Sequence, residues 1–419
     1  MPPRSIPLQF SRMHPWHDTP LTSRSPHPPT PHNPPQLLSP SHALKHTLFH
    51  LSMVLILIAT LLLLLSLSPY SQALDAPYTD PKSKTCSAPL LRKEWRALNA
   101  SEQTAYISAI RCLTTQPSAL RKLLPGSQSR FDDFQGVHIL QMENVHLNGR
   151  FLPWHRYFTA VWEGALRGSC GYRGSQPYWD WSLDSEEGST WAESPVFSTT
   201  TGFGGNGTSS SLNSSLVLLS MPDSQLTYLG PYVPCSEQPY ESPCVMNGTG
   251  GGCITNGPFA NLTLHMGPGK RVERNDHCIT RDFHPYVQDW FSEQEVNSTL
   301  SEKSFESLWR RIEGMFEVRQ LGLHGAGHLG VGGTLADVYS SPGDPLFYLH
   351  HANLDRLWWQ WQQKDPERRY TDISSPDMQG REAGRVTLNY ELNMEKLAKK
   401  VIVKDIMKIN DGILCYNYM

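Results

Sequence analysis

Several common features are scarce or missing in this chain of 419 residues. Charged residues make up only 18% of it, the formal net charge is −3, and basic residues form no block, which argues against nucleic acid as a partner. None of the eight cysteines forms a C-x-x-C pair, which argues against a thiolate zinc site or a dithiol redox motif. No internal repeat is visible, so we expect one large domain over residues 86–418.

The N-terminal region is predicted to direct export. Residues 1–47 are rich in Pro, Ser and His and have few periodic apolar residues, so we expect them to be disordered. Residues 48–73 contain an apolar run, Leu51 to Leu67, which we interpret as a signal peptide or a signal anchor. The charges before this run are all positive, which favours translocation of the rest of the chain. Two alternatives remain open: a type II membrane anchor, which alone would give a membrane partner, and translation from Met53.

Features after the apolar run are typical of a secreted or luminal glycoprotein. All eight cysteines follow the run, and an even count in an oxidising compartment favours disulfides. Six N-x-S/T acceptor sites also follow it, at Asn99, Asn206, Asn213, Asn247, Asn261 and Asn297.

Apolar periodicity and capping signals predict a mainly helical domain. The expected helices span residues 87–115, 153–167, 304–318 and 344–361. The last one is expected to begin with Asp344 as its N-cap and Pro345 at its first position. Residues 185–280, rich in Gly, Ser, Pro and Asn, are expected to be irregular, and residues 386–419 to contain short strands.

Six histidines fall in two clusters of three. The first cluster is His138, His146 and His155, and the second is His324, His328 and His351. Neutral imidazole is a good ligand for copper, zinc, iron and nickel. Three such ligands leave a coordination position free for chemistry. The two clusters therefore predict two metal ions held side by side.

Spacing constrains the second cluster. His324 and His328 are four residues apart, which places them on one face of a helix. A zinc protease with this spacing needs Glu directly after the first His, and Gly325 occupies that position. Asp355 follows His351 by four residues, so it could orient His351 or a neighbouring group.

The first cluster requires a break in the chain. His146 and His155 are nine apart, which would put them on opposite faces of one continuous helix. Gly149 and Pro153 interrupt the segment, so a loop can turn both side chains inward. We also predict a turn at residues 143–144, after His138.

His350 is the alternative to its neighbour His351. It faces a different side of the predicted helix, in phase with Leu346 and Leu354. We interpret it as packed in the core or lying behind the ligands, and we keep open that it is the ligand itself.

Two segments carry a resemblance to a known family. The pattern H-x4-F-L-P-W-H-R at His146–Arg156 and the pattern D-P-x-F-Y-x-H-H-x3-D at Asp344–Asp355 resemble the two copper-binding signatures of tyrosinases and catechol oxidases. The resemblance implies a mainly α fold, in which a central four-helix bundle holds two copper ions with three His each, amid long irregular loops. It also implies that the second His of the pair, His351, is the ligand.

The resemblance also implies an activity. Its members use dioxygen to oxidise o-diphenols to o-quinones, and true tyrosinases also hydroxylate monophenols. Two copper ions side by side can hold both oxygens of one dioxygen. Neutral ligands leave the site cationic, which favours binding of a phenolate. We therefore expect a small phenolic substrate and dioxygen as the partners.

Two positions depart from the family pattern. Many fungal members have a Cys, linked to the second His of the first site, where this chain has Asn144, so we predict no such link there. Many true tyrosinases have Asn where this chain has Gly325, and that Asn helps a Glu hold a water. Glu317 or Glu313 could supply the Glu, but the missing Asn favours diphenol oxidation. By the same resemblance, Leu329 is expected to make the pocket mouth apolar.

The end of the chain resembles the close of the family's catalytic core, so we expect a short form without a lid domain. Among many connectivities, we expect Cys415 to pair with Cys86. Alternative functions are a tailoring enzyme that hydroxylates one phenolic metabolite or peptide, and a haemocyanin-like oxygen or copper carrier without turnover. A dizinc or diiron hydrolase would require carboxylate ligands, which neither cluster offers.

Overall fold

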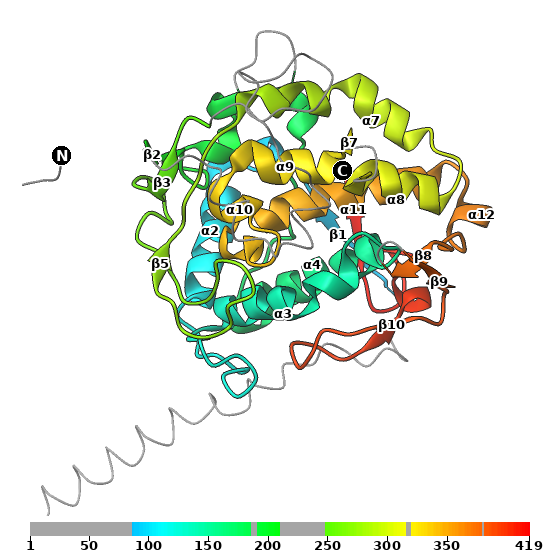
Figure 1. The fold of residues 1–419 in the computed structure, drawn as a ribbon, viewed down its shortest axis with the longest axis horizontal. Helices are drawn as coiled ribbons and strands as arrows, with labels where there is room; N and C mark the ends of the chain where they lie inside the picture. The colour runs from blue at the N-terminus through cyan, green and yellow to red at the C-terminus, as the bar shows by residue number, and fades with distance from the viewer. Residues whose placement is uncertain (1–85, 186–190, 210–247, 316–319, 379–380) are drawn as a thin grey trace, which may run out of the picture. The chain divides into compact units, whose positions relative to one another are not determined.

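A computed structural model describes residues 86–185, 191–209, 248–315, 320–378 and 381–419 (Figure 1). The predictions for residues 1–47 and 48–73 lie outside this part of the chain, as do the acceptor sites Asn213 and Asn247. Among the described residues, no helix combines the length and the apolar character that a membrane span needs.

Helices are the main regular structure, which confirms the predicted fold class. The α-helices are α2 (Ala100–Leu113), α3 (Arg130–Val145), α4 (Phe151–Cys170), α7 (Glu293–Leu300), α8 (Phe305–Glu313), α9 (Leu323–Val331), α10 (Gly333–Ala336), α11 (Phe347–Gln363) and α12 (Pro366–Arg369). The strands, all in two-stranded sheets, are β1 (Leu90–Arg92), β2 (Gly207–Ser209), β3 (Gly251–Ile254), β4 (Thr263–Leu264), β5 (His277–Cys278), β6 (Gly314–Met315), β7 (Gln320–Leu321), β8 (Pro376–Met378), β9 (Arg381–Arg385), β10 (Glu391–Leu392), β11 (Val401–Ile402) and β12 (Tyr416–Tyr418).

Four helices form the centre of the fold. Helix α11 packs against α4 on one side and α9 on the other, and α3 packs against α4 (Figure 1). Aromatic side chains fill the space between them: Trp162 of α4 stacks on Tyr348 of α11 with ring centroids 3.6 Å apart. Both rings are fully buried, and burial of such large apolar surfaces is the main favourable term in folding.

The helix predicted over residues 87–115 is wrong in its first half. Residues Leu90–Arg92 form β1, which pairs in parallel with β12 at the other end of the described chain. The helix begins only at Ala100, because Asn99 and Glu102 form a capping box in which each side chain accepts the other's backbone N–H.

Two other predicted helices are present with shifted ends. Helix α4 begins two residues earlier than expected and continues past Gly168 to Cys170. Its C-cap is Gly171, in the left-handed conformation (φ 65°). Helix α11 begins at Phe347. The Asp344 carboxylate accepts from the Leu346 backbone N–H at 3.0 Å and so closes the turn before the helix, where we had expected an N-cap.

The remaining predictions for local structure have mixed outcomes. Ser304 caps α8, which ends at Glu313 and not at residue 318, because Gly314 (φ 107°) starts β6. The turn predicted at residues 143–144 is wrong, since α3 continues to Val145. Short strands within residues 386–419 are present as predicted.

Disulfide bonds link separate segments of the described chain. The expected pair Cys86–Cys415 is confirmed, and it ties the segment before β1 to the segment before β12. Two further pairs are Cys112–Cys170 and Cys253–Cys278. No cysteine of the described residues is free, so none of these six can link to a histidine.

Candidate metal centre

The first histidine cluster comes from α3, its C-terminal end and α4. His138 lies inside α3, His146 is the C-cap that directly follows α3, and His155 lies near the start of α4. One nitrogen of each lies within 4.8 Å of the others. The predicted break is present, because residues 146–150 separate the two helices and allow both His146 and His155 to face His138.

Specific contacts hold this loop in shape. Leu147 adopts a left-handed conformation (φ 57°), which is uncommon for leucine, and its backbone N–H donates to Glu313 Oε1 at 2.7 Å. The Asn148 side chain donates to the carbonyls of Asn144 and His146 at 3.1 and 2.8 Å. These bonds fix the reversal of the chain directly after a candidate ligand.

The second cluster comes from α9 and α11. His324 and His328 lie on α9 at the predicted helical spacing, and His351 lies on α11. Nitrogens of these three residues and of His350 lie within 4.8 Å of one another. The rings of His155 and His351 stack with centroids 4.4 Å apart, so the two clusters are in direct contact.

Main-chain carbonyls orient four of the six rings. In each case Nδ1 lies within hydrogen-bond distance of a carbonyl oxygen, and the pairs are His138 with Tyr339 (2.6 Å), His146 with Met142 (3.0 Å), His155 with Phe151 (2.8 Å) and His328 with Leu335 (2.6 Å). A carbonyl only accepts, so Nδ1 carries the proton and Nε2 has the free lone pair. This arrangement is the one that metal-binding histidines use. Sequence reasoning missed these carbonyls, because no side-chain pattern marks them.

The nitrogens that remain fit a pair of metal ions. The Nε2 atoms of His138, His155 and His324 are buried without a hydrogen-bond partner in the described part of the chain. A buried polar atom left unpaired costs about 1–3 kcal/mol, and coordination would remove that cost. The Nε2 atoms of His328 and His351 are 3.2 Å apart, as expected for two nitrogens that each lie about 2 Å from one metal. An all-nitrogen donor set suits copper and lacks the carboxylates of a hydrolytic diiron site.

His350 has both ring nitrogens engaged elsewhere. Trp181 Nε1 donates to its Nδ1 at 3.1 Å, so its Nε2 carries the proton and donates to the His324 carbonyl at 3.1 Å. His351 Nδ1, in contrast, has no partner among the described residues, and its Nε2 faces His328. The hydrogen bonds therefore favour His351 as the ligand and place His350 behind the ligands.

Burial keeps the candidate ligands neutral. Desolvation lowers the pKa of His146 to about 3 and that of His328 to about 4. It also lowers the pKa of the other four well below the ordinary value of histidine, and neighbouring histidines add to that effect in His138, His155, His324 and His351. Neutral imidazole is the form that binds metals.

Two of the six candidate rings are partly accessible to solvent. His146 and His324 are half-buried, and their ring centroids are 5.7 Å apart. The other four are buried: His138, His155, His328 and His351. Gly325 and Leu329 directly follow the two histidines of α9 and are also half-buried. The role of Leu329 at a pocket mouth stays a prediction.

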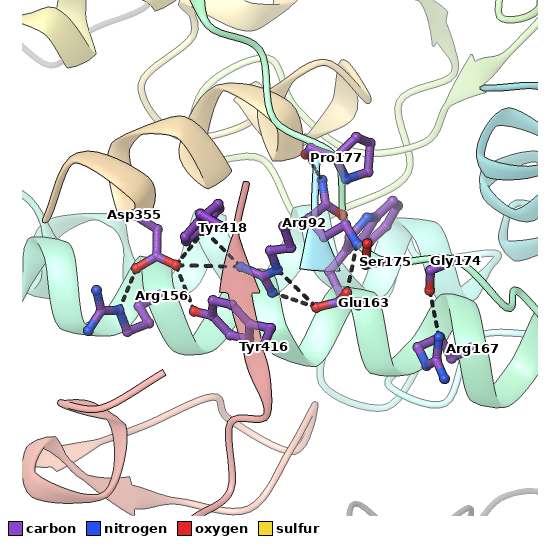
Figure 2. Close-up of polar contacts among 12 residues, drawn as sticks. Arg92, Arg156, Glu163, Arg167, Gly174, Ser175, Pro177, Asp355, Tyr416 and Tyr418 are labelled. Atoms are coloured by element: carbon purple, nitrogen blue, oxygen red, sulfur yellow. Dashed lines mark hydrogen bonds and ion pairs between the residues drawn. The ribbon is translucent and has the colours of Figure 1, made fainter. Parts of the chain in front are cut away.

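Asp355 does not orient His351, contrary to the first of our two expectations. Its carboxylate forms a buried ion pair with Arg156, the residue after His155 (Figure 2). It therefore acts on a neighbouring group, which was the second expectation. Because Arg156 lies on α4 and Asp355 on α11, the pair joins the helices that carry His155 and His351.

The Asp355 carboxylate also contacts strands near both ends of the described chain. Tyr416 and Tyr418 of β12 donate their hydroxyls to Asp355 Oδ2, each at 2.6 Å. Arg92 of β1 lies between Asp355 (3.4 Å) and Glu163 (2.5 Å), as Figure 2 shows. A buried charge is tolerated only when its partners are complete, and here each has several.

The two glutamates proposed to hold a water have different outcomes. Glu317 lies outside the described residues. Glu313 is buried at the end of α8, where burial raises the pKa of its carboxyl to about 8. Both oxygens of Glu313 are engaged, one by the Leu147 backbone N–H and the other by Trp309 Nε1 at 2.5 Å.

Comparisons with known proteins agree with this geometry. The family described as "Common central domain of tyrosinase" matches residues 128–364, more than half of the chain. The tyrosinase-like protein phomQ1 of Diaporthe leptostromiformis is 34% identical over 81% of this chain and 80% of its own. The N-acetyl-6-hydroxytryptophan oxidase ivoB of Emericella nidulans is 32% identical over 85% and 99%. Among solved structures, a mutant polyphenol oxidase of Thermothelomyces thermophila matches with a TM-score of 0.69 and 30% identity, over 79% of this chain and 89% of the other.

We expect the metal-free protein to become less stable as the pH falls below about 6.5. Unfolded histidines protonate near pH 6.5, whereas the folded pKa is about 3 for His146 and about 4 for His328. Between these values the unfolded state binds more protons, so the free energy of unfolding decreases with decreasing pH. Urea unfolding at a series of pH values measures this. His328→Gln should show a shallower decline, and an equal slope in both proteins would contradict the assignment.

Proposed function

The chain belongs to the tyrosinase family of copper oxidoreductases, and we propose that it uses dioxygen to oxidise o-diphenols to o-quinones. The observation that carries the proposal is the pair of histidine clusters with lone pairs that converge without partners. We propose that one copper is held by His138, His146 and His155, and the other by His324, His328 and His351.

When bound, the two copper ions would transfer electrons from the diphenol to dioxygen. Each diphenol gives up two electrons and two protons, so two diphenols reduce one dioxygen to two waters. The protein keeps the six imidazoles neutral and orients four of them through main-chain carbonyls. Neutral ligands would not offset the charge of the copper ions, so the site would be cationic and would favour binding of a phenolate. Phe347 stacks on His351 with centroids 4.1 Å apart, and Phe151 lies against His324 at 4.6 Å, so the ligands sit in apolar surroundings.

One observation supports an enzyme over an oxygen carrier, and a second supports a preference for diphenols. The half-buried His146 and His324 give a substrate a side from which to approach, whereas a pure oxygen carrier has no need of one. Gly325 offers no side-chain amide to hold a water, and the oxygens of Glu313 already accept from Leu147 and Trp309. Hydroxylation of a monophenol needs a base for the phenol. Gly325 provides no group that could hold a water for this task, and each oxygen of Glu313 already accepts one hydrogen bond.

A narrower function is the second candidate. One of the relatives is named for oxidation of N-acetyl-6-hydroxytryptophan, a single phenolic metabolite, and the match covers 99% of that relative. This observation favours a tailoring enzyme with one natural phenol. Turnover of a panel of phenols separates the two candidates, because a tailoring enzyme accepts few of them.

We also propose that the protein enters the secretory pathway and carries glycans. Three acceptor sites are exposed, at Asn99, Asn261 and Asn297. Asn206 is half-buried, and its side-chain nitrogen donates to Thr249 at 2.8 Å. Glycopeptide mass spectrometry of protein from the native host should find glycans at the exposed sites and none at Asn206. Complete absence of glycans would refute the proposal.

Copper loading tests the ligand set. Native metal analysis should give two coppers per chain, and the loaded protein treated with hydrogen peroxide should develop a strong near-ultraviolet band and oxidise catechol. His328→Ala should lose one copper, the band and the activity, because a ligand is gone. His350→Ala is the matched control and should keep both coppers. The band without catechol turnover would indicate a carrier, and copper loss only in His350→Ala would show that the ligand set is wrong.

Gly325→Asn tests the preference for diphenols. A Cβ at this position meets only the end of the Leu321 side chain, at 2.7 Å, so the helix accommodates the change. The wild type should oxidise a diphenol at least about 10-fold faster than the matched monophenol, a difference of about 1.4 kcal/mol in barrier. Gly325→Asn should lower the ratio of the diphenol rate to the monophenol rate. Equal wild-type rates on both substrates would overturn the preference.

A further inference from the structure

A single short segment orients one histidine from each cluster. His328 Nδ1 donates to the Leu335 carbonyl at 2.6 Å, and His138 Nδ1 donates to the Tyr339 carbonyl, also at 2.6 Å. The two carbonyls are four residues apart: Leu335 lies in α10, and Tyr339 lies before the turn that precedes α11. Both histidines are buried, so neither ring can find water as a substitute partner.

The middle of this segment is held by the Asp337 carboxylate. Its Oδ1 accepts the backbone N–H groups of Tyr339 and Ser340 at 2.9 and 2.8 Å. Its Oδ2 accepts the backbone N–H of Gly269, in a distant loop, at 2.7 Å. Asp337 is buried, and hydrogen bonds from backbone groups to a buried carboxylate are short and strong.

These contacts act on the Tyr339 carbonyl directly and on the Leu335 carbonyl through the intervening chain. The Leu335 carbonyl lies in the last turn of α10, which the Asp337 backbone N–H closes by donating to the Thr334 carbonyl at 3.2 Å. The carboxylate acts on this carbonyl through the chain that directly follows α10, which it holds in place. The Ser340 N–H belongs to the same planar peptide as the Tyr339 carbonyl, so its bond to Asp337 Oδ1 sets the direction of that carbonyl. If the carboxylate is removed, the segment loses three bonds at the point between the two carbonyls.

We propose that Asp337 is a positioning residue that sets the imidazole orientation of His138 and His328 together. Each of these histidines belongs to a different cluster, so one carboxylate supports both metal positions. The inference rests on the proposed function for the identity of the metal, but the orientation of the rings is a property of the metal-free protein as well.

Two variants of Asp337 and one control test the inference. Asp337→Ala removes all three bonds, and Asp337→Asn keeps one acceptor oxygen and serves if the alanine variant folds poorly. Tyr339→Phe is the matched control. It removes the bond from the Tyr339 hydroxyl to Glu143, at 2.9 Å, and leaves the carbonyl that His138 uses.

The first measurement is copper affinity by competition with a chelator, together with the electron paramagnetic resonance of the loaded protein. Loss of a group behind a metal ligand weakens metal binding by about 10–100-fold. We expect Asp337→Ala to weaken both coppers to that extent and to give a signal from uncoupled copper, with Tyr339→Phe unchanged. A lower melting temperature with wild-type copper affinity, or loss of one copper only, would overturn the inference.

The second measurement needs no copper. Nitrogen chemical shifts of 15N-labelled histidine in the metal-free protein report which ring nitrogen carries the proton. His138 and His328 should hold the proton on Nδ1 in the wild type and in Tyr339→Phe, and should become tautomer mixtures in Asp337→Ala. Unchanged tautomers would refute the positioning role even if the oxidase activity is established, and a wild type without copper or activity would refute only the proposed function.

Discussion

The hydrogen bond from a histidine Nδ1 to a main-chain carbonyl is the interaction on which the rest of the site depends. It decides which nitrogen faces the other cluster, and so whether the lone pairs converge. For His146 and His155 the carbonyl belongs to the residue four positions earlier, so the local helix supplies it. His138 and His328 instead use carbonyls far from them in sequence or beyond the end of their helix. The local bonds form with the helices, whereas the other two require the tertiary structure to be complete.

A buried polar network connects this site to both ends of the described chain. Asp355 lies one turn after His351, and Arg156 directly follows His155, so their ion pair connects the backbones that carry these two histidines. Arg92 adds a second cation, with its guanidinium 3.4 Å from the centroid of the Tyr416 ring. Isolated charges at this depth would be strongly unfavourable. The network is therefore stable only when β1 and β12 are both in place, which couples closure of the chain to the packing of α4 against α11.

The site could be predicted from the sequence where it depends on residue type and on the spacing of residues within one helix or loop. The positions of His324 and His328 on one helix face and the break after His146 follow from helical geometry, and the structure contains both. The pairing of β1 with β12 joins residues at opposite ends of the domain, and no local pattern encodes it. A main-chain carbonyl such as that of Tyr339 cannot be predicted as a hydrogen-bond partner from residue type, because every residue has one. Glu313 could be proposed from its position, but its engagement with Leu147 depends on where the fold places a loop.

Packing against neighbouring side chains explains some of the glycines in α9 but not all of them. Glycine inside a helix costs about 1 kcal/mol relative to alanine, so each needs a reason. At Gly327 a Cβ would lie 2.2 Å from the His350 ring, and at Gly330 it would lie 2.7 Å from Trp191, both in buried surroundings that cannot yield. Gly325 differs, because its Cβ would meet only the flexible end of Leu321. Packing therefore requires the first two glycines but does not require the third, which lies beside the half-buried His324. At position 325 the helix leaves room for a side chain, so packing alone does not explain why glycine stands there.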